Sequence, residues 1–171
     1  MTSRLTHKTV FTAIALMLLS SLSINAVAAD AIPAAPAFTA EQLVAIPDSN
    51  WITNGGNAYN QRYSSLDQIN RDNVSGLQAE WRTRLRGSGT GPRNSAQGQS
   101  LVYEGVLYII TGDNDVFALD VETGEIRWEY TAELDPDRVH VCCGWTNRGV
   151  AMGEGMIFFG RLDAMLVALD Q

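Results

Sequence analysis

The sequence lacks several features on which common classes of protein depend. Beyond residue 30, no apolar segment approaches the roughly 20 residues that a transmembrane helix needs. From residue 47 onward, no helical apolar period extends over any length. Lysine occurs only at Lys8, so residues 30–171 carry ten arginines against nineteen acidic residues, a formal charge of −9. Because nucleic-acid affinity comes from neutralising phosphates, this balance argues against nucleic acid and against an anionic membrane surface as partners.

Common metal and haem patterns are also missing. The chain has two histidines, His7 and His140, and two adjacent cysteines, which are too few for a structural zinc site. It has no Cys-x-x-Cys-His segment, so no covalent haem is expected. Asp113-Asn114-Asp115 lacks the other positions of a calcium loop and is interpreted as a turn. None of these patterns therefore indicates a zinc, calcium or haem site within this chain.

The N-terminus has the three parts of a secretory signal peptide. Arg4 and Lys8 form a basic region, an apolar run extends from Val10 to about Leu22, and Ala26-Val27-Ala28-Ala29 supplies small residues for cleavage. The apolar run is shorter than a membrane anchor requires. We expect residues 1–29 to be a signal peptide, which predicts a periplasmic protein without a membrane span after cleavage.

The next residues, 30–46, are predicted to be a linker that ends in one short helix. Thr39 and Gln42 have the spacing of a capping box, and Pro47 would end the helix. From residue 47 to 171 the apolar segments are short, β-branched or aromatic, and separated by Gly, Asn and Asp. This pattern is typical of strands and turns, so this part of the chain is predicted to be all-β.

One internal repeat indicates the architecture. Residues 104–120 align without gaps on residues 154–170, an offset of fifty residues, with six of 17 positions identical. Such periods indicate solenoids, propellers or arrays, and about four strands fit into each repeat. We predict a partial β-propeller of about two four-stranded blades that ends in the middle of a repeat. A β-sandwich with two similar hairpins is the alternative.

The first repeat continues with a spaced signature, Ala118-x-Asp120-x-x-Thr123-Gly124-x-x-x-Trp128. Its Thr-Gly pair predicts a tight turn. Trp128 is predicted to dock on the neighbouring blade, because a large ring can bury much apolar area between repeats.

The two cysteines, Cys142 and Cys143, are neighbours in the chain. Adjacent Cα atoms lie about 3.8 Å apart across a trans peptide, closer than the roughly 4.4–6.8 Å of ordinary disulfides. A bond between them would close a strained ring, and such strain clusters at functional sites. Two reduced thiols that merely pack are the alternative, which the pair by itself favours. Export to an oxidising compartment favours the bond.

Three blocks of the sequence resemble the N-terminal part of the pyrroloquinoline-quinone (PQQ)-dependent alcohol dehydrogenases, the methanol/ethanol dehydrogenase group. The blocks run from Trp51 to Trp81, from Ala118 to Trp128 and from Cys142 to Ala151. The resemblance covers nearly all of residues 47–171. It implies an eight-bladed quinoprotein propeller, of which this chain supplies about the first two blades, and the oxidation of primary alcohols to aldehydes.

The resemblance also implies roles for four residues. The Cys142–Cys143 disulfide would stack on one face of the quinone, and Arg148 would pair with a carboxylate of the cofactor. Gln97 aligns with a family glutamate that hydrogen-bonds the cofactor, and replaces that charge with a neutral amide. The implied cofactors are PQQ with calcium or a lanthanide. The implied partners are a small alcohol substrate and an electron acceptor such as a cytochrome c.

By the same resemblance, the metal ligands and the catalytic aspartate belong to blades after residue 171, so we expect the chain to be inactive alone. Two other interpretations stay open. One is a non-catalytic envelope β-propeller that acts as a binding or assembly module, and the other is a decayed or mis-assigned reading frame. The cysteine pair followed by Arg148 favours the enzyme segment, because a scaffold gains nothing evident from a strained ring.

Overall fold

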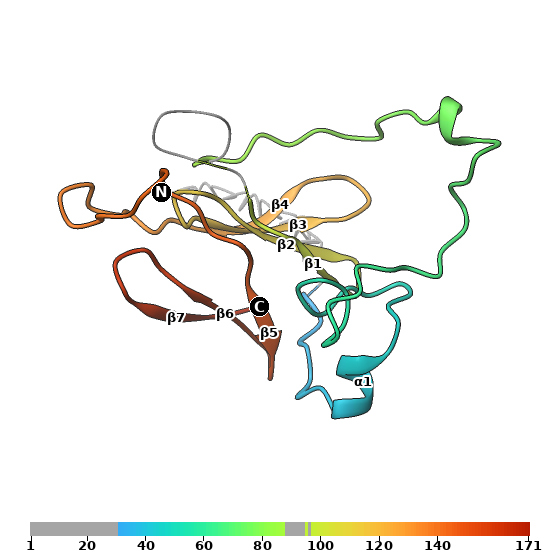
Figure 1. Ribbon diagram of the computed structural model, residues 1–171, viewed down its shortest axis with the longest axis horizontal. Coiled ribbons are helices and arrows are strands. Elements are labelled where there is room, and N and C mark those ends of the chain that lie inside the picture. The colour runs from blue at the N-terminus through green and yellow to red at the C-terminus, as the bar shows by residue number, and fades with distance from the viewer. Residues whose placement is uncertain (1–30, 88–94, 96) are drawn as a thin grey trace, which may run out of the picture. The chain divides into compact units, whose positions relative to one another are not determined.

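The computed structural model describes residues 31–87, 95 and 97–171, so the predicted signal peptide, residues 1–29, lies outside the described residues. The compact unit Ile32–Gln171 contains two antiparallel sheets and one short α-helix (Figure 1). Its elements are α1 (Ala40–Val44), a 3₁₀ turn (Val74–Gly76), β1 (Leu101–Tyr103), β2 (Val106–Ile110), β3 (Val116–Asp120), β4 (Ile126–Tyr130), β5 (Ala151–Gly153), β6 (Met156–Gly160) and β7 (Leu166–Asp170).

The helix α1 begins where the sequence predicts it. The Thr39 hydroxyl accepts a hydrogen bond from the Gln42 amide at 3.3 Å, and the Gln42 side chain accepts one from the Thr39 amide at 2.8 Å. This reciprocal capping box satisfies two backbone donors that the first turn would otherwise leave unpaired. The helix ends at Val44, three residues before Pro47. None of the helices that the structure describes is long and apolar enough to cross a bilayer.

The two sheets repeat one design at the predicted offset. The first has the order β1-β2-β3-β4 and the second the order β5-β6-β7, with all neighbours antiparallel. The pairing of Val106 with Asp120 recurs as the pairing of Met156 with Asp170. The prediction of an all-β chain built from propeller blades is therefore confirmed, and the repeat exists in strand register as well as in sequence.

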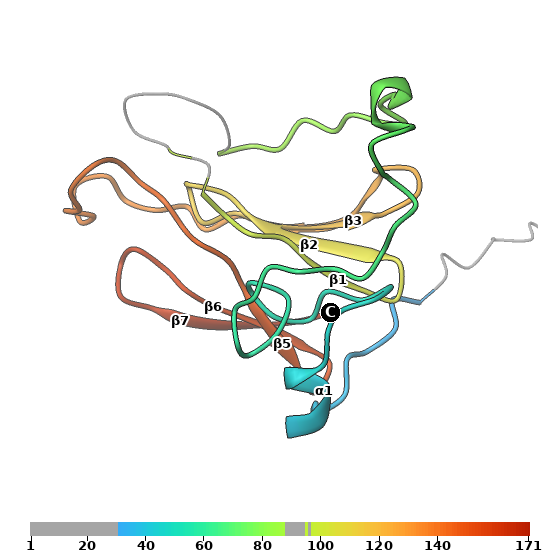
Figure 2. The same ribbon diagram turned by 45° about the vertical axis from the view of Figure 1, so that its right-hand side comes forward.

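The core lies between the two sheets, which face one another (Figures 1 and 2). In β2 every second residue is fully buried, because alternate side chains of a strand point to the same face. The residues buried in this cluster are Ala35, Leu101, Val106, Tyr108, Ile110, Val116, Ala118, Val150, Met152, Ile157 and Phe159. Since they come from both sheets, neither sheet keeps its apolar face in water.

Aromatic side chains extend this core. Trp128 on β4 packs against the cluster, and its ring lies 6.1 Å from the Tyr108 ring of the same sheet. The docking of Trp128 on the neighbouring blade stays a prediction. Tyr130 contacts Phe159 of the second sheet edge to face, with ring centroids 5.6 Å apart. The hydroxyl of Tyr130 also accepts a hydrogen bond of 2.8 Å from Arg161.

The opposite face of the first sheet is covered by the segment before it. The Arg86 guanidinium lies 5.6 Å from the centroid of the buried Phe117 ring, a cation–π contact. The Trp81 indole donates to the carbonyl of Val121 at 3.0 Å. The turn that contains Gly124 is tight, as predicted: Gly124 has a φ of 72°, and an added Cβ would collide with the Trp81 ring.

We expect Ile157→Ala to lower the free energy of unfolding by about 2–5 kcal/mol, because it leaves a cavity between the sheets. Ile157 is 0% exposed. Leu166→Ala in β7 is the matched control, since Leu166 is 79% exposed and a surface change should stay within about 0.5 kcal/mol. Urea denaturation followed by tryptophan fluorescence measures both. Equal losses in the two variants would contradict the assignment of the core.

Candidate functional site

Two backbone segments that occupy equivalent positions in the two repeats lie side by side and form hydrogen bonds with each other. The Ser95 amide donates to the Trp145 carbonyl at 2.8 Å, and the Gln99 amide donates to the Arg148 carbonyl at 3.1 Å. Gln99 and Gly149 form a parallel bridge. Both Ser95–Trp145 and Gln99–Gly149 are fifty residues apart, which is the offset of the repeat. The pairing therefore joins corresponding positions of consecutive blades.

This pairing joins the two backbone segments that carry the residues predicted from sequence. Gln97 lies between the two paired points of its own segment, which we call the Gln97 segment (residues 95 and 97–99). Arg148 lies on the partner, the cysteine segment (residues 142–149), which begins with Cys142 and Cys143. All four side chains are exposed. The structure thus places them on adjacent backbone segments at an open surface.

Two glycines allow the segments to approach so closely. A Cβ added at Gly98 would collide with the carbonyl oxygen of Ile110. Gly149 has a φ of 149°, and a Cβ there would lie 3.3 Å from the Gln99 carbonyl oxygen. A side chain at either position would separate the segments from each other or from the first sheet.

Side-chain amides anchor the cysteine segment on two sides. Asn147 donates to the Gly160 carbonyl at the end of β6 at 2.8 Å, and its own oxygen accepts from the Gly149 amide at 3.3 Å. Asn54, far earlier in the chain, donates to the Arg148 carbonyl at 3.2 Å. Sequence reasoning included Asn54 in a family block but gave it no role. Asn147 is the residue fifty positions after Gln97, so the repeat offset could have identified it as the equivalent residue in the second repeat.

Arg148 presents its charge to solvent. Other arginines are paired: Arg86 contacts Glu129 at 2.9 Å and Arg161 contacts Asp163 at 2.6 Å. Within residues 31–87, 95 and 97–171, the guanidinium of Arg148 makes no ion pair. An exposed, unpaired guanidinium can bind a carboxylate through two parallel hydrogen bonds.

Gln97 carries no charge and keeps both kinds of hydrogen-bonding group. Its amide nitrogen donates to the Ser95 hydroxyl at 3.2 Å. The second N–H of the amide and its carbonyl oxygen can still meet a ligand.

The cysteines differ from the expectation at one point. Cys142 and Cys143 are free thiols in the structure, so the predicted bond between them is not formed there. Their side chains share a hydrogen bond, and this bond, together with repulsion from Cys142, raises the pKa of the Cys143 thiol. Cys143 has a φ of 65°, and Gly144 follows with a φ of 87°. The backbone thus turns sharply at the pair, and the disulfide stays a prediction.

Trp145, within the cysteine segment, lines a small acidic cavity. Its side chain is only 7% exposed and lines a cavity of about 180 Å³ together with Asp113, Asp115, Thr131, Glu133 and Leu134. Burial raises the pKa of Asp115, although the Ala132 amide donates to its carboxylate at 2.9 Å.

Asp113-Asn114-Asp115 forms a turn, in which the backbone amide of Asn114 donates to the Thr111 carbonyl at 3.0 Å. Among the residues that the structure describes, no three His, Cys, Asp or Glu side chains are grouped so as to hold a metal ion.

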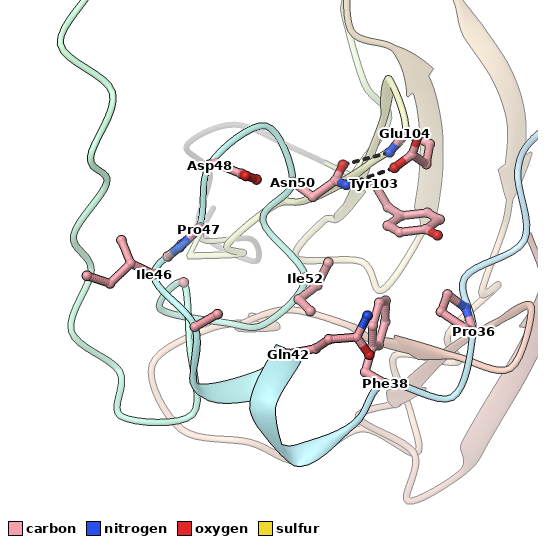
Figure 3. A pocket seen from close by; sticks show the side chains of 12 residues that line it. Pro36, Phe38, Gln42, Ile46, Pro47, Asp48, Asn50, Ile52, Tyr103 and Glu104 are labelled. Carbon is pink, nitrogen blue, oxygen red and sulfur yellow. Dashed lines mark hydrogen bonds between the residues drawn. The ribbon is translucent and has the colours of Figure 1, made fainter.

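A larger cavity of about 380 Å³ lies between α1 and the turn that joins β1 to β2 (Figure 3). The Phe38 and Tyr103 rings meet edge to face at 5.8 Å. The Asn50 amide donates to the Glu104 carboxylate at 2.9 Å. The residues that line the cavity are Pro36, Phe38, Gln42, Ala45, Ile46, Pro47, Asp48, Asn50, Ile52, Gly56, Tyr103 and Glu104. It shares no residue with the Gln97 segment or the cysteine segment.

Two blade-like sheets joined through equivalent segments define a part of a β-propeller. A family model of the PQQ-dependent glucose/ethanol/alcohol dehydrogenase β-propeller domain matches residues 51–171. The chain therefore belongs to this family of quinoprotein alcohol dehydrogenases.

Individual relatives agree with this assignment. The quinoprotein alcohol dehydrogenase PedH of Pseudomonas putida is 42% identical over 120 residues, which cover 70% of this chain and 20% of that enzyme. The 1-butanol dehydrogenase (quinone) of Thauera butanivorans is 40% identical over 111 residues, which cover 65% of this chain and 17% of that enzyme. The chain thus spans about a fifth of the length of these relatives.

Solved structures show the same fold. The quinohemoprotein alcohol dehydrogenase from Comamonas testosteroni superposes with a TM-score of 0.65 at 34% identity, covering 71% of this chain and 18% of that one. A europium-containing methanol dehydrogenase superposes with a TM-score of 0.63 at 35% identity, covering 71% of this chain and 21% of that one.

In the reduced chain, Cys142→Ala should speed the alkylation of Cys143 by iodoacetamide near pH 8. The variant removes the hydrogen bond and the repulsion that raise the pKa of Cys143. More of the thiol is then ionised at this pH, and the thiolate is the nucleophile. Alkylation rates against pH, followed by mass spectrometry, measure the change. Val141→Ala is the control at the other neighbour of Cys142, and an equal acceleration there would contradict this explanation.

Proposed function

We propose that this chain supplies one wall of the PQQ site of a quinoprotein alcohol dehydrogenase that oxidises primary alcohols to aldehydes. The observation that carries the proposal is the pairing of the Gln97 segment with the cysteine segment, since these two segments carry an exposed arginine, a neutral amide and two adjacent cysteines. Family membership supports the cofactor, and the names of the relatives support alcohols as substrates.

The chemistry of these four residues fits a planar, anionic quinone. Arg148 would bind a carboxylate of PQQ, and its lack of an ion pair among the described residues leaves both edges of the guanidinium accessible. Gln97 would hydrogen-bond the cofactor in place of the family glutamate, as donor or as acceptor. Cys142 and Cys143 would present polarisable sulfur to the flat face of the ring.

When bound, the quinone would supply the redox chemistry by accepting the hydride of the alcohol. The residues of this chain would bind and orient it.

We propose calcium or a lanthanide as the accompanying metal, held by residues outside this chain, and the europium-containing relative supports the second choice. A cytochrome c is the proposed electron acceptor, because one relative is a 1-butanol dehydrogenase (cytochrome c). We also propose export to the periplasm through residues 1–29.

A disulfide between Cys142 and Cys143 is part of this proposal. The proposed export supports it, because neighbouring thiols can lose two hydrogen atoms to an oxidant in an oxidising compartment and form a disulfide that persists there. Closing the ring would remove the rotational freedom of both side chains and give the quinone a rigid platform.

Mass spectrometry of the exported chain without reduction tests the ring. We expect the peptide that contains Cys142 and Cys143 to be lighter by two hydrogen atoms than its reduced form, and to resist alkylation until a reductant is added. The same peptide from protein kept in reductant serves as the control. Two alkylated cysteines in the unreduced sample would disprove the bond.

The cofactor wall is tested by titrating the isotopically labelled chain with PQQ and recording amide chemical shifts. We expect saturable shifts at Gln97, Cys142, Cys143 and Arg148. Arg148→Ala should weaken binding about tenfold or more, because a charge-assisted pair is lost. Arg138→Ala is the matched control, since Arg138 is an exposed arginine that pairs with Asp135 at 3.4 Å.

The same chain, supplied with PQQ and calcium or a lanthanide, should not oxidise alcohols, since no metal ligand or catalytic base is assigned in it. Shifts that are confined to other residues, or an equal effect of the two arginine variants, would overturn the proposed wall. Turnover by the purified chain would overturn the view that it supplies only one part of the site.

A further inference from the structure

The carbonyl oxygen of Arg148 connects the cysteine segment with two other parts of the chain, the Gln97 segment and the turn that carries Asn54. It accepts the Gln99 amide at 3.1 Å and the Asn54 side-chain amide at 3.2 Å. A carbonyl oxygen has two lone pairs, so these two bonds use its full accepting capacity. Its position is thereby fixed from the Gln97 segment and, independently, from a turn ninety-four residues earlier in the sequence.

The turn that carries Asn54 is itself held firmly. Trp51 and Val102 exchange two backbone hydrogen bonds, of 2.7 and 3.0 Å, which tie the turn to β1. The Gly56 amide donates to the Thr53 carbonyl at 3.0 Å, and the Arg62 amide donates to the Gly55 carbonyl at 2.8 Å. The backbone around Asn54 is therefore fixed by hydrogen bonds, so its side chain can fix the position of the Arg148 carbonyl.

Gly149 makes room for this contact. An added Cβ at Gly149 would lie 3.2 Å from the Asn54 amide nitrogen, closer than side chains ordinarily pack. Because residue 149 is a glycine without a side chain, Asn54 can reach the carbonyl oxygen of Arg148.

We infer that Asn54 is a positioning residue, which holds the backbone of Arg148 so that the guanidinium meets the cofactor carboxylate. Asn54 is exposed and its side chain makes this one hydrogen bond among the described residues. The bond therefore acts on the placement of Arg148 more than on the stability of the fold. The inference rests on the proposed quinone wall and assigns Asn54 no contact with the quinone itself.

A double-mutant cycle on the whole chain tests the inference. PQQ affinity is measured from amide shifts for the unchanged chain, Asn54→Ala, Arg148→Ala and the double variant. Asn54→Ala should weaken binding about fivefold, the effect of one lost hydrogen bond. In the Arg148→Ala background the same change should cost nothing more, because Asn54 acts through Arg148. Losses that add across the cycle would overturn the inference.

Asn50→Ala is the matched control, because Asn50 is a half-buried asparagine just before the same turn. Its side chain bonds Glu104 in both directions, donating at 2.9 Å and accepting from the Glu104 amide at 2.8 Å (Figure 3). PQQ affinity should stay within about twofold of the unchanged chain, although two hydrogen bonds are lost. A loss equal to that of Asn54→Ala would show a general loosening of the segment and would overturn a specific role.

Backbone relaxation without quinone gives an independent result. In Asn54→Ala the order parameter of the Arg148 amide should fall from about 0.85 toward about 0.6, the range of flexible backbone. It should not change in Asn50→Ala. If the unchanged chain binds no PQQ, the quinone wall is disproved, while relaxation still decides whether Asn54 positions Arg148. An unchanged order parameter in Asn54→Ala would disprove the positioning role even if PQQ binds.

Discussion

The burial of two apolar sheet faces against each other is the constraint on which the rest of the structure depends. The facing sides of the two sheets are apolar, and residues such as Tyr108 and Ile157 are buried between them. Because the sheets are repeats of one design, this contact also aligns the segments that precede β1 and β5. Gln99 therefore pairs with Gly149, its equivalent fifty residues later. The candidate site thus follows from the packing of one repeat on the next.

Arg86 and Arg161 are tied into the fold by carboxylates, whereas Arg148 is one of several arginines without an ion pair among the described residues. The chain is strongly acidic, and its carboxylates hold Arg86 and Arg161 by ion pairs beside the two sheets. Arg86 serves the fold through the buried Phe117 ring, and Arg161 through the Tyr130 hydroxyl. Arg148 has no carboxylate partner among the described residues, and its backbone carries the contacts that hold it. The side chain of Arg148 is exposed.

Local signals in the sequence were sufficient for the fold but only partly for the site. The capping box at Thr39 and the fifty-residue repeat depend on neighbours in the chain, and both are confirmed. The role of Asn54 depends on a contact across ninety-four residues, which no local pattern contains. The redox state of the cysteine pair is a different case, because it depends on the compartment as well as on geometry.

Gln97 gives this wall an electrostatic character of its own. A carboxylate at this position would stand on the segment next to Arg148 and would offset part of its charge. The amide keeps the hydrogen-bonding capacity without that opposing charge, so Gln97, Cys142, Cys143 and Arg148 together carry one positive charge when the thiols are neutral or joined. An anionic ligand would meet an attraction undiminished by this neighbour. The cost is that Gln97 cannot repel an anion held in the wrong orientation, so orientation depends more heavily on the placement of Arg148, and hence on the residues that hold its backbone.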